Sequence, residues 1–493
     1  MKIQCVFILL ALMCELTAAT PQWPQFRGPN GSGVAEEARP PVRFGPSTNQ
    51  LWKTPIPFGV SAPVVWGNRI FLSAHASNQL VTIAFDAESG RELWRRVAPA
   101  KNIERCHNFS SPAASTPCTD GQRVYSYFGS FGLIAYNFQG EELWQRPFER
   151  LPSSYGTATS PMLAGGKLIL QRDGDSTNAQ VIALEPATGK TIWEAARPLA
   201  GASYSTPMVW RHDGIEELLI QGKGRLAAYD LNRGELKWWV KGWGFAAVTT
   251  PVAGDGMLFA GGSGMGDPAE PEDPILNWNN LIKNHDANQD GILALDEIPE
   301  SVGWHIRKEV PKETPGNYFP VRNLMSWFVD ADKNKEITKA EWDELQAFSK
   351  DKYNADRFVA IRAGGKDDST ETHVEWETTR GLSEMPSPLF YRGRVHFIRD
   401  GGLWTVLDPR KGTRLVDRER LPSRGQSVAS PVAANGHIYV VDESGTFTVL
   451  RAGDGVDVVH VARLGENVRA TPAIAGDCLY VRTSEHLWAF RGK

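Results

Sequence analysis

Two short stretches of the sequence carry side-chain oxygens at the alternating positions that a hard divalent cation requires. They run from Asp286 to Glu297 and from Asp330 to Glu341, so each begins with Asp and has Glu at its twelfth position. In proteins Ca²⁺ takes about six to eight oxygen ligands from carboxylates, amides and backbone carbonyls. The sequence therefore predicts two calcium-binding loops.

The first loop follows the EF-hand pattern, in which acidic and amide side chains alternate around a turn glycine, here Gly291. Its seventh residue would give a backbone carbonyl and its last a bidentate carboxylate. The candidate ligands are Asp286, Asn288, Asp290, Ile292 and Glu297. We expect an entering helix over 276–285 and an exit helix near Pro299, where a first-turn proline is tolerated.

The second loop departs from the pattern at its turn position. Its candidate ligands are Asp330, Asp332, Asn334, Glu336 and Glu341. Lys335 replaces the glycine, so a side chain must adopt a positive φ at a cost of about 1 kcal/mol, and its ammonium repels the ion. We expect weaker binding here. The EF-hand resemblance also implies that Leu293 and Ile337 pair as a short β contact. The alternative for both loops is a solvated acidic turn without an ion.

Both loops lie in an acidic segment, residues 264–352, which holds 18 Asp+Glu and 10 Lys+Arg and has a net charge of −8. Because the whole chain has a formal charge of −4, the remainder carries +4. The ion could hold this segment folded or switch a partner site. We favour the first role, because only Met265 and Met325 occur here and no Met-rich face is formed.

Outside this segment the sequence repeats a proline step that opens a short apolar run and that Ser or Thr precedes in most units. The eight prolines are Pro63, Pro117, Pro161, Pro207, Pro251, Pro388, Pro431 and Pro472. Six of the seven spacings lie between 41 and 54 residues, and the seventh is 137. One insertion into the fifth of eight units explains the exception.

Four units end with Gly followed four residues later by Trp. The pairs are Gly90 and Trp94, Gly140 and Trp144, Gly189 and Trp193, and Gly234 and Trp238. This spacing predicts a hairpin whose glycine takes a positive φ and whose Trp packs on a neighbouring sheet. We favour that packing over a platform for sugars or cations.

These features resemble the pyrroloquinoline quinone (PQQ)-type propeller repeat, with the Gly-x-x-x-Trp tail as its specific element. The resemblance covers about residues 47–263 and 353–493. It is to non-catalytic secreted members and outer-membrane assembly scaffolds, and more distantly to quinoprotein alcohol dehydrogenases. The tail weakens late in the chain, since Val416 follows Gly412 and Asp457 follows Gly453 at the Trp position.

The expected fold is therefore all-β, an eight-bladed PQQ-like propeller with a small α-helical EF-hand insertion in blade 5. The expected divisions are a signal peptide (1–19), an N-terminal arm (20–46), propeller (47–263), the insertion (264–352) and propeller (353–493). The last unit offers three strands, so we expect the strand over 51–56 to complete its blade and leave no open edge. Trp23 in the arm should pack on the propeller surface.

The first residues place Lys2 before the apolar run from Val6 to Met13 and small residues at 17–19, which is typical of a secretory signal peptide. The run is too short to span a membrane, and no later stretch is long enough. We expect a secreted or periplasmic protein without a transmembrane segment. Cys14 leaves a lipid anchor open, although Leu12 and Met13 are bulky for such a site.

Export would leave three cysteines in an oxidising compartment. A disulfide between Cys106 and Cys118 is one possibility and free thiols are the other. Cys478 should be a small buried hydrophobic residue. The sequence argues against nucleic acid as a partner, because it has no run of Lys and Arg that would bind phosphate groups.

Loops that precede the eight prolines should line one mouth of the ring. Their polar and aromatic residues are Arg105, His107, Asn108, Tyr155, Tyr204, Glu384, Arg424, Gln426 and Arg469. They could bind an anionic or sugar-like ligand, but no pair has diagnostic spacing, and ordinary loop contacts are the favoured interpretation. The partner, protein or glycan, stays open.

Catalysis has less support. The resemblance implies that quinone enzymes carry two adjacent cysteines and a calcium beside a catalytic Asp, and neither a Cys-Cys pair nor a matching Asp is found. PQQ is therefore possible but doubtful, whereas Ca²⁺ is expected. We favour a non-catalytic binding or assembly scaffold, and a PQQ-dependent oxidoreductase acting on alcohols or sugars is the alternative.

Overall fold

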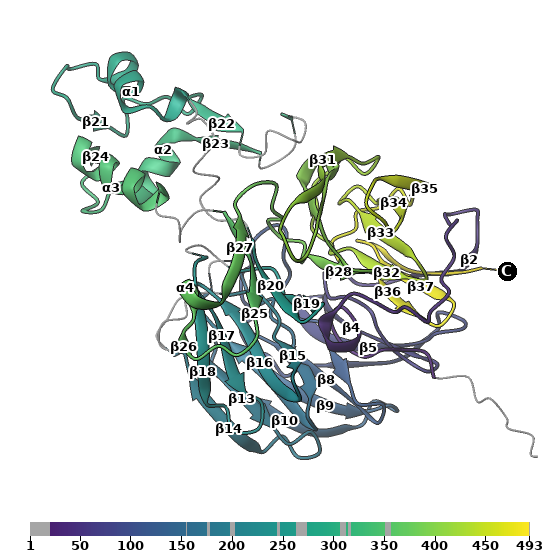
Figure 1. The fold of residues 1–493 in the computed structure, drawn as a ribbon. Helices are drawn as coiled ribbons and strands as arrows, with labels where there is room; N and C mark the ends of the chain where they lie inside the picture. Colours follow the sequence, from purple (N-terminus) through teal and green to yellow (C-terminus); the bar gives the residue numbers. More distant parts are fainter. Residues whose placement is uncertain are drawn as a thin grey trace, which may run out of the picture.

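Eight β-sheets, the blades, surround a common axis, and each is built on four strands. A small module, the insertion, stands apart from them (Figure 1). The computed structural model describes residues 20–492 except 154, 175–177, 198–202, 244–246, 263–273, 306–311, 314–316 and 351–355. The expected signal peptide, 1–19, lies outside the described residues. No helix among the described residues is long and apolar enough to cross a membrane.

Each blade has four antiparallel strands, which run in sequence order from the axis outward in blades 1 to 7, whereas the outer strand of blade 8 precedes blade 1 in the chain. Blade 1 holds β3 (Val64–Trp66), β4 (Arg69–Ala76), β5 (Gln79–Asp86) and β6 (Glu92–Val97); blade 2 holds β7 (Cys118–Thr119), β8 (Arg123–Phe128), β9 (Gly132–Asn137) and β10 (Glu142–Pro147). Blade 3 holds β11 (Met162–Ala164), β12 (Lys167–Arg172), β13 (Gln180–Leu184) and β14 (Thr191–Ala196); blade 4 holds β15 (Met208–His212), β16 (Ile215–Gly222), β17 (Arg225–Asp230) and β18 (Leu236–Lys241).

The second half of the ring contains the interrupted blade and the seam. Blade 5 holds β19 (Val252–Gly254), β20 (Met257–Gly262), β25 (Arg357–Arg362) and β27 (Val374–Thr378); blade 6 holds β28 (Leu389–Tyr391), β29 (Arg394–Arg399), β30 (Leu403–Leu407) and β31 (Arg414–Arg420). Blade 7 holds β32 (Val432–Ala434), β33 (His437–Val441), β34 (Thr446–Arg451) and β35 (Asp457–Arg463); blade 8 holds β36 (Ala473–Ala475), β37 (Cys478–Arg482), β38 (His486–Arg491) and β2 (Gln50–Pro55).

The seam closes as the sequence predicts. β2 pairs antiparallel with β38, with Gln50 opposite Phe490 and Pro55 opposite His486. Blade 8 is therefore built from both ends of the chain, and its outer strand comes from a segment that precedes blade 1.

Tryptophans on the outer strands join each blade to the next. The indole Nε1 of Trp94 donates to Phe138 O at 2.9 Å, that of Trp144 to Pro186 O at 3.0 Å, and that of Trp193 to Leu231 O at 3.2 Å. The ring of Trp144 lies against Gly189 of the next blade, where a Cβ would come within 2.7 Å of the indole, and Gly189 has φ +69°. The predicted sheet packing is confirmed. Trp52 and Trp376 dock in the same way on Ala87 and Pro409.

Trp238 also packs on the next blade and differs from the other three only in its hydrogen bond. Its Nε1 donates within its own blade to Glu217, and Gly365 lies over its ring. The reason is that blade 5 carries the insertion, and its returning segment forms β26 (Asp367–Asp368), which pairs in parallel with β18. A short helix, α4 (Thr370–His373), follows β26.

A belt of hydroxyl groups connects the residues that precede the prolines. Ala62 N donates to Thr116 Oγ1 at 2.9 Å, Thr116 N to Ser160 Oγ at 3.0 Å, and the same bond recurs from Ser160 to Thr206 at 3.2 Å. On the other side of the ring it links Thr250 to Ser387, Ser387 to Ser430, and Ser430 to Thr471 at 2.9–3.1 Å. Each hydroxyl thus satisfies a buried N–H of the preceding blade, which explains the Ser/Thr before proline.

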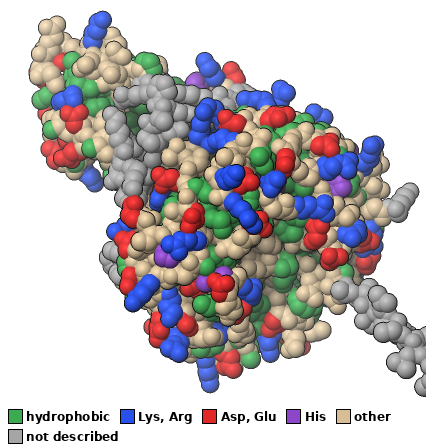
Figure 2. All heavy atoms as spheres, viewed as in Figure 1, with side chains coloured by type: hydrophobic (Ala, Val, Ile, Leu, Met, Phe, Trp, Pro, Cys, Tyr) green, Lys and Arg blue, Asp and Glu red, His purple; other side chains and the backbone are tan. Residues whose placement is uncertain are grey.

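The hydrophobic core lies between neighbouring blades. One cluster combines Ile169 and Val181 of blade 3 with Val209, Leu218 and Ile220 of blade 4, all at most 1% exposed. Lys, Arg, Asp and Glu side chains are interspersed over the ring surface in Figure 2, and acidic ones dot the insertion. Blade packing of this kind stabilises each sheet through its neighbours.

The insertion has its own elements and core. These are a 3-10 turn (Pro274–Leu276), α1 (Trp278–His285), β21 (Leu293–Ala294), β22 (Gly303–His305), β23 (Tyr318–Pro320), α2 (Val321–Leu324), a π-helical turn (Met325–Val329), β24 (Glu336–Ile337) and α3 (Lys339–Lys350). The expected exit helix near Pro299 is wrong among the described residues, because that segment turns and enters the β22–β23 hairpin. Its core includes Trp278, Leu281, Met325 and Trp342.

The possible disulfide is also wrong, because Cys106, Cys118 and Cys478 are all free thiols. Cys118 lies in β7 and packs inside blade 2, whereas Cys106 lies in the loop before it and packs against Gly156. The two thiols therefore belong to different surroundings. Cys478 is 1% exposed in the core of blade 8, as expected of a small hydrophobic residue.

Candidate functional site

The first acidic loop of the insertion wraps its backbone around its own side-chain oxygens. Asp286 Oδ1 accepts from Gln289 N at 2.7 Å and its Oδ2 accepts from Gly291 N at 2.9 Å. Glu297 Oε1 accepts from Ala287 N at 3.1 Å, and Oε2 accepts from Ala294 N at 3.0 Å. The last carboxylate of the loop therefore reaches back to its start.

The second loop has the same hydrogen-bond pattern. Asp330 Oδ2 accepts from Lys335 N at 3.1 Å, and Glu341 accepts from Ala331 N at 3.3 Å and from Thr338 N at 2.9 Å. Lys335 adopts φ +69°, which is the positive φ expected when a side chain replaces the turn glycine. The pattern repeats although the turn residue differs.

Three carboxylates converge in the second loop. Oxygens of Asp330, Asp332 and Glu341 all lie within 4.8 Å of one another. In the first loop the acidic ligands form no such group in the described part of the chain, and Asn288 Nδ2 instead donates to Asp290 Oδ2 at 2.8 Å. Hydrogen bonds, chiefly from the backbone N–H of Thr338, lower the pKa of Glu341, whereas partial burial raises it. The hydrogen bonds have the larger effect, so the pKa lies below its usual range.

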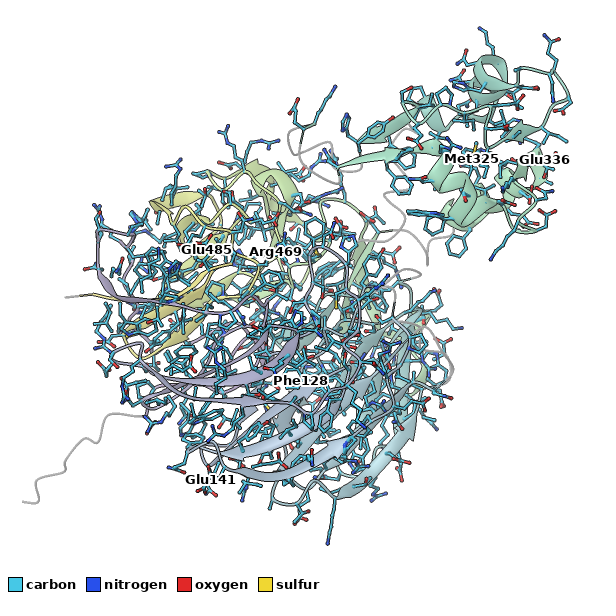
Figure 3. All side chains as sticks on the ribbon, turned by 180° about the vertical axis from the view of Figure 1, so that it is seen from behind. Phe128, Glu141, Met325, Glu336, Arg469 and Glu485 are labelled. Carbon is cyan, nitrogen blue, oxygen red and sulfur yellow. The ribbon has the colours of Figure 1, made fainter. Side chains whose placement is uncertain are left out.

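A short β bridge joins the two loops. Leu293 pairs with Ile337 and Ala294 with Glu336 through β21 and β24, so the predicted contact is confirmed. Leu295 N also donates to Lys335 O at 3.0 Å. Leu293 and Ile337 are fully buried, and Met325 is buried beneath them, whereas Glu336 is exposed (Figure 3).

The insertion and the loops before the prolines leave the ring at the same end, which we call the proline end. Innermost strands begin there, and the antiparallel second strand of blade 5, β20, returns there before the insertion starts. In Figure 3, Arg469 and Glu485, which lie in loops of this end, are on the side of the ring nearer the insertion, and Glu141, on a turn of the opposite end, is far from it.

Aromatic side chains from three of these loops meet at the proline end. The ring centroids of His107 and Tyr155 are 5.2 Å apart, and those of Tyr155 and Tyr204 are 5.8 Å apart with planes at 88°. Phe109 lies 5.2 Å from His107. Tyr155 is 42% exposed, so this group of rings presents an aromatic surface to solvent.

Arg469, in the loop before blade 8, holds the loop that carries His107 and Phe109. Its Nη1 donates to Asn108 O at 2.5 Å, and its guanidinium lies 5.3 Å from the ring of Phe109. Glu443 of blade 7 pairs with it at 2.6 Å. The loop over 101–110 therefore crosses blade 1 and is held from both sides.

Several residues named from the sequence do not join this group. Arg105 and Arg424 are exposed, Gln426 is 3% exposed within the ring, and Glu384 is exposed in a separate loop. Sequence reasoning missed Phe109, Glu443 and Glu104. Glu104 is 6% exposed and accepts from Thr157 N and Oγ1, both at 3.2 Å, and burial raises its pKa. Nothing in the spacing of these residues marks them.

A second acidic group lies in blade 8. Oxygens of Glu466 and Glu485 and a nitrogen of His486 lie within 4.8 Å of one another. Lys53 pairs with Glu466 at 2.7 Å, and Thr483 donates to the same carboxylate. The Glu466 carboxylate is thus paired with the ammonium of Lys53, and because Lys53 belongs to β2, this ion pair stabilises the closure of blade 8.

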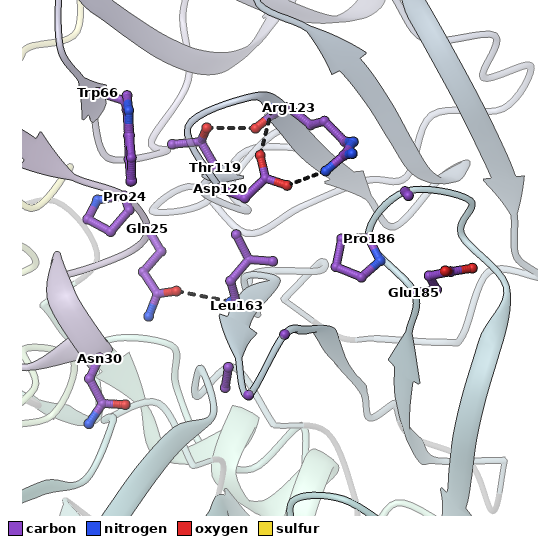
Figure 4. Close-up of a pocket in the computed structure, with 14 residues that line it drawn as sticks. Pro24, Gln25, Asn30, Trp66, Thr119, Asp120, Arg123, Leu163, Glu185 and Pro186 are labelled. Atoms are coloured by element: carbon purple, nitrogen blue, oxygen red, sulfur yellow. Dashed lines mark hydrogen bonds and ion pairs between the residues drawn. The ribbon is translucent and has the colours of Figure 1, made fainter.

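A pocket of about 590 Å³ opens at the opposite end of the ring, between blades 2 and 3 (Figure 4). Trp66, Leu163 and Pro186 give it apolar walls. Asp120 pairs with Arg123 at 2.7 Å at its rim and is held ionised by hydrogen bonds despite its partial burial, so that its pKa is lowered. Pro24, Gln25 and Asn30 of the N-terminal arm form another wall.

Comparison with known proteins supports the same architecture. The family model described as outer membrane protein assembly factor BamB matches residues 45–154 and 362–493, just under half of the chain. A search among curated proteins found no match.

Solved structures show the fold. BamB from Moraxella catarrhalis has a TM-score of 0.53 at 12% identity, covering 90% of this chain and 97% of that one. Quinohemoprotein alcohol dehydrogenase from Comamonas testosteroni has a TM-score of 0.51 at 12% identity, covering 96% and 81%. The computationally designed Ika8 protein has a TM-score of 0.52 at 10% identity, covering 90% and 100%.

The chain is therefore an eight-bladed PQQ-like propeller repeat protein. More particularly, β2 with blades 1 and 2, and the outer strand of blade 5 with blades 6 to 8, lie in the ranges that the BamB family model matches. The unmatched stretch holds blades 3 and 4, the first three strands of blade 5 and the insertion.

Proposed function

We propose that this protein is an exported, non-catalytic propeller that acts as a binding or assembly scaffold and carries a calcium-binding insertion. The observation that carries the proposal is the gathering of its most exposed aromatic loops and its acidic insertion at the proline end. Two structures on one end can contact one partner at the same time. A protein or a glycan is the partner class that an aromatic surface with hydrogen-bonding loops fits.

The calcium part of the proposal rests on the two loops. Oxygens of Asp286, Asn288, Asp290 and Glu297, with the carbonyl of Ile292, are of the type and number that Ca²⁺ prefers. The converging carboxylates of Asp330, Asp332 and Glu341 support the second site, with Asn334 and the carbonyl of Glu336 as further ligands. We infer that the ions hold the insertion folded.

Location outside the cytoplasm is part of the same proposal. The apolar run near the N-terminus supports export, and the match to an outer membrane assembly factor is consistent with it. Cysteines that are all free give no support from disulfides.

Replacing one ligand tests the calcium site. Glu297→Gln removes the bidentate carboxylate and should weaken binding to the first loop by at least about tenfold, because a neutral amide is a poorer ligand for a hard cation. Asp296→Asn is the matched control, since it removes the same charge from the neighbouring residue without removing a ligand. Calorimetric titration with Ca²⁺ measures both. Equal affinities in Glu297→Gln and the wild type would refute the site.

Quinone retention tests the non-catalytic proposal. Six of the hydroxyls before the prolines, those of Thr116, Ser160, Thr206, Ser387, Ser430 and Thr471, are engaged in the belt of backbone bonds, so we expect them not to hold a quinone. The protein would be incubated with PQQ and Ca²⁺ and desalted, and its absorbance measured. Bound quinone in stoichiometric amount would overturn the proposal in favour of an oxidoreductase, and its loss on desalting would support a scaffold.

A further inference from the structure

The N-terminal arm, residues 20–39, crosses the end of the ring opposite the proline end. β1 (Gln22–Trp23) pairs with β3 of blade 1, and Thr119 N of blade 2 donates to Pro24 O at 2.8 Å. On the other side, Ala433 N of blade 7 donates to Gly33 O at 2.8 Å and Gly476 O of blade 8 accepts from Arg39 N at 2.8 Å. A single segment therefore spans the axis.

Two side-chain amides of the arm bond to backbone groups on the inner strands of blades 3 and 4. Asn30 Oδ1 accepts from Val209 N at 3.0 Å and its Nδ2 donates to Val209 O at 2.7 Å, so one amide satisfies both groups on the inner edge of blade 4. Gln25 Oε1 accepts from Leu163 N of blade 3 at 3.1 Å. With Arg27 Nη2 donating to Pro388 O of blade 6 at 2.5 Å, the arm bonds to seven blades.

These bonds are opposed by an unusual cost at Arg27. Its side chain is 0% exposed, and among the described residues no carboxylate pairs with it. Nε and Nη1 have no hydrogen-bond partner in that part of the chain. Burial lowers the pKa of Arg27 to about 9. A buried charge without a counter-ion is strongly destabilising.

The backbone of the arm adds strain. Arg27 and Asn30 have φ +58° and +52°, in the left-handed region that residues other than glycine rarely adopt. Such conformations persist only where surrounding contacts fix them, and they occur often in segments that switch. The arm is thus bonded at many points and at the same time carries a local penalty of its own, an unpaired buried guanidinium and two residues with positive φ.

We propose that the arm is a releasable plug, which closes this end of the ring and opens while the eight blades stay folded. Opening would hydrate the Arg27 guanidinium and relax two strained residues. It would also free the inner edges at Leu163 and Val209 and remove one wall of the pocket beside blades 2 and 3. The proposal goes beyond the scaffold function, because it concerns the end that carries no insertion.

Hydrogen–deuterium exchange of the whole protein in increasing denaturant tests it. Amides whose bonds depend on the arm, such as Ala35 and Val209, should exchange by an opening that depends little on denaturant and is faster than exchange in the second and third strands of the blades. If the arm amides exchange only with the denaturant dependence of global unfolding, the arm is an inseparable part of the ring and the proposal is overturned.

Asn30→Ala gives the matching variant. It leaves both Val209 groups without partners in the closed state, so arm amides should exchange at least about tenfold faster while blade amides are unchanged. Asn68→Ala, which removes an exposed asparagine bonded to Asp86, is the control and should change neither. Uniform acceleration across the ring in Asn30→Ala would count against independent opening.

Deletion of residues 20–34 keeps the arm from closing at all and retains Phe44 and β2. The shortened protein should show the secondary structure and cooperative unfolding of the ring. If it is unfolded, the blades cannot stay folded with the arm released, and the proposal fails.

Discussion

Lys335 occupies the turn position of the second acidic loop, and we expect it to weaken the proposed calcium site without changing the shape of the loop. It holds φ +69° at the position where the first loop has Gly291 at φ +81°, and the loop bonds around it are the same. A side chain in this region costs about 1 kcal/mol, and the ammonium adds repulsion toward a cation.

Lys335→Gly should therefore tighten calcium binding at the second loop. The gain comes from removal of the ammonium, which repels the ion; relief of the positive φ stabilises the loop with and without the ion, because Lys335 already has φ +69° in the ion-free loop. Isothermal titration measures the affinity, and Lys333→Gly, which also removes a lysine with positive φ (+61°) but outside the turn position, is the matched control. An affinity in Lys335→Gly no higher than that of the wild type would contradict this account.

His396 is a buried titratable group in the core of blade 6. It is 1% exposed, stacks 5.4 Å from Trp404, and burial followed by repulsion from Arg394 lowers its pKa to about 4 from 6.5. Because the folded pKa is the lower one, the unfolded chain binds the proton first. Stability is fully present above about pH 6.5 and falls as the pH drops toward 4.

His396→Phe should remove this pH dependence. The wild type should lose at most roughly 3 kcal/mol of unfolding free energy between these pH values through this group. Urea unfolding at pH 7 and pH 4.5 would measure the difference, and Phe keeps the stacked ring. The variant should lose clearly less stability on acidification, and an unchanged loss would assign the effect to other groups.

At the scale of the elements, the repeat could be predicted and its exceptions could not. The Gly and Trp spacing predicts hairpins and docking, and Trp94, Trp144 and Trp193 bear this out. Trp238 packs in the same way against Gly365 of the interrupted blade, but its indole N–H donates to Glu217 of its own blade instead of to the next blade. A spacing within one blade carries no information about what the next blade offers.

The residues of the hydroxyl belt form a pattern in the sequence, Ser or Thr before proline, but each hydrogen bond joins two blades and two residues about one repeat apart. A local pattern gives no reason for such a contact, so the residues looked like ordinary turn residues. In the same way, Phe109 and Arg469 meet across the mouth although 360 positions separate them. The acidic loops of the insertion, by contrast, follow local patterns, and the sequence predicts the Leu293–Ile337 bridge that joins them.

Removing residues 51–56 should leave β38 as an unpaired edge. Five residues of β2 pair with β38, and the freed backbone groups of that strand can pair with another chain. The variant should form oligomers or aggregates in size-exclusion chromatography and light scattering. Deleting the two-residue β26 segment, which pairs with the outer strand of a blade that already has four strands, is a control and should leave a monomer. A monomeric 51–56 deletion would contradict the seam argument.

At the scale of the whole molecule, the insertion has a hydrophobic core separate from those of the ring. Trp278, Leu281 and Trp342 form the core of the insertion, and no ring residue belongs to that cluster. An ion bound to the insertion therefore stabilises that module and not the ring, by about 2.7 kcal/mol when its concentration is 100 times Kd.

Chelation with EDTA should lower the unfolding temperature of the insertion and leave that of the ring unchanged. Differential scanning calorimetry with and without Ca²⁺ would resolve the two transitions. A variant in which a Gly/Ser linker replaces residues 264–352 is the control and should not respond to the ion. A calcium-dependent shift of the ring transition would show that the modules are coupled.

Closure of blade 8 by both ends of the chain sets the order in which the protein can be made. The strand that leaves the ribosome early, β2, has no partner until β38, about 430 residues later, has been synthesised. The entropy of closing so long a loop must be overcome before the last blade forms. A chain delivered across a membrane from its N-terminus would thus carry an open ring throughout transport, and its final folding step can occur only after the whole polypeptide has arrived.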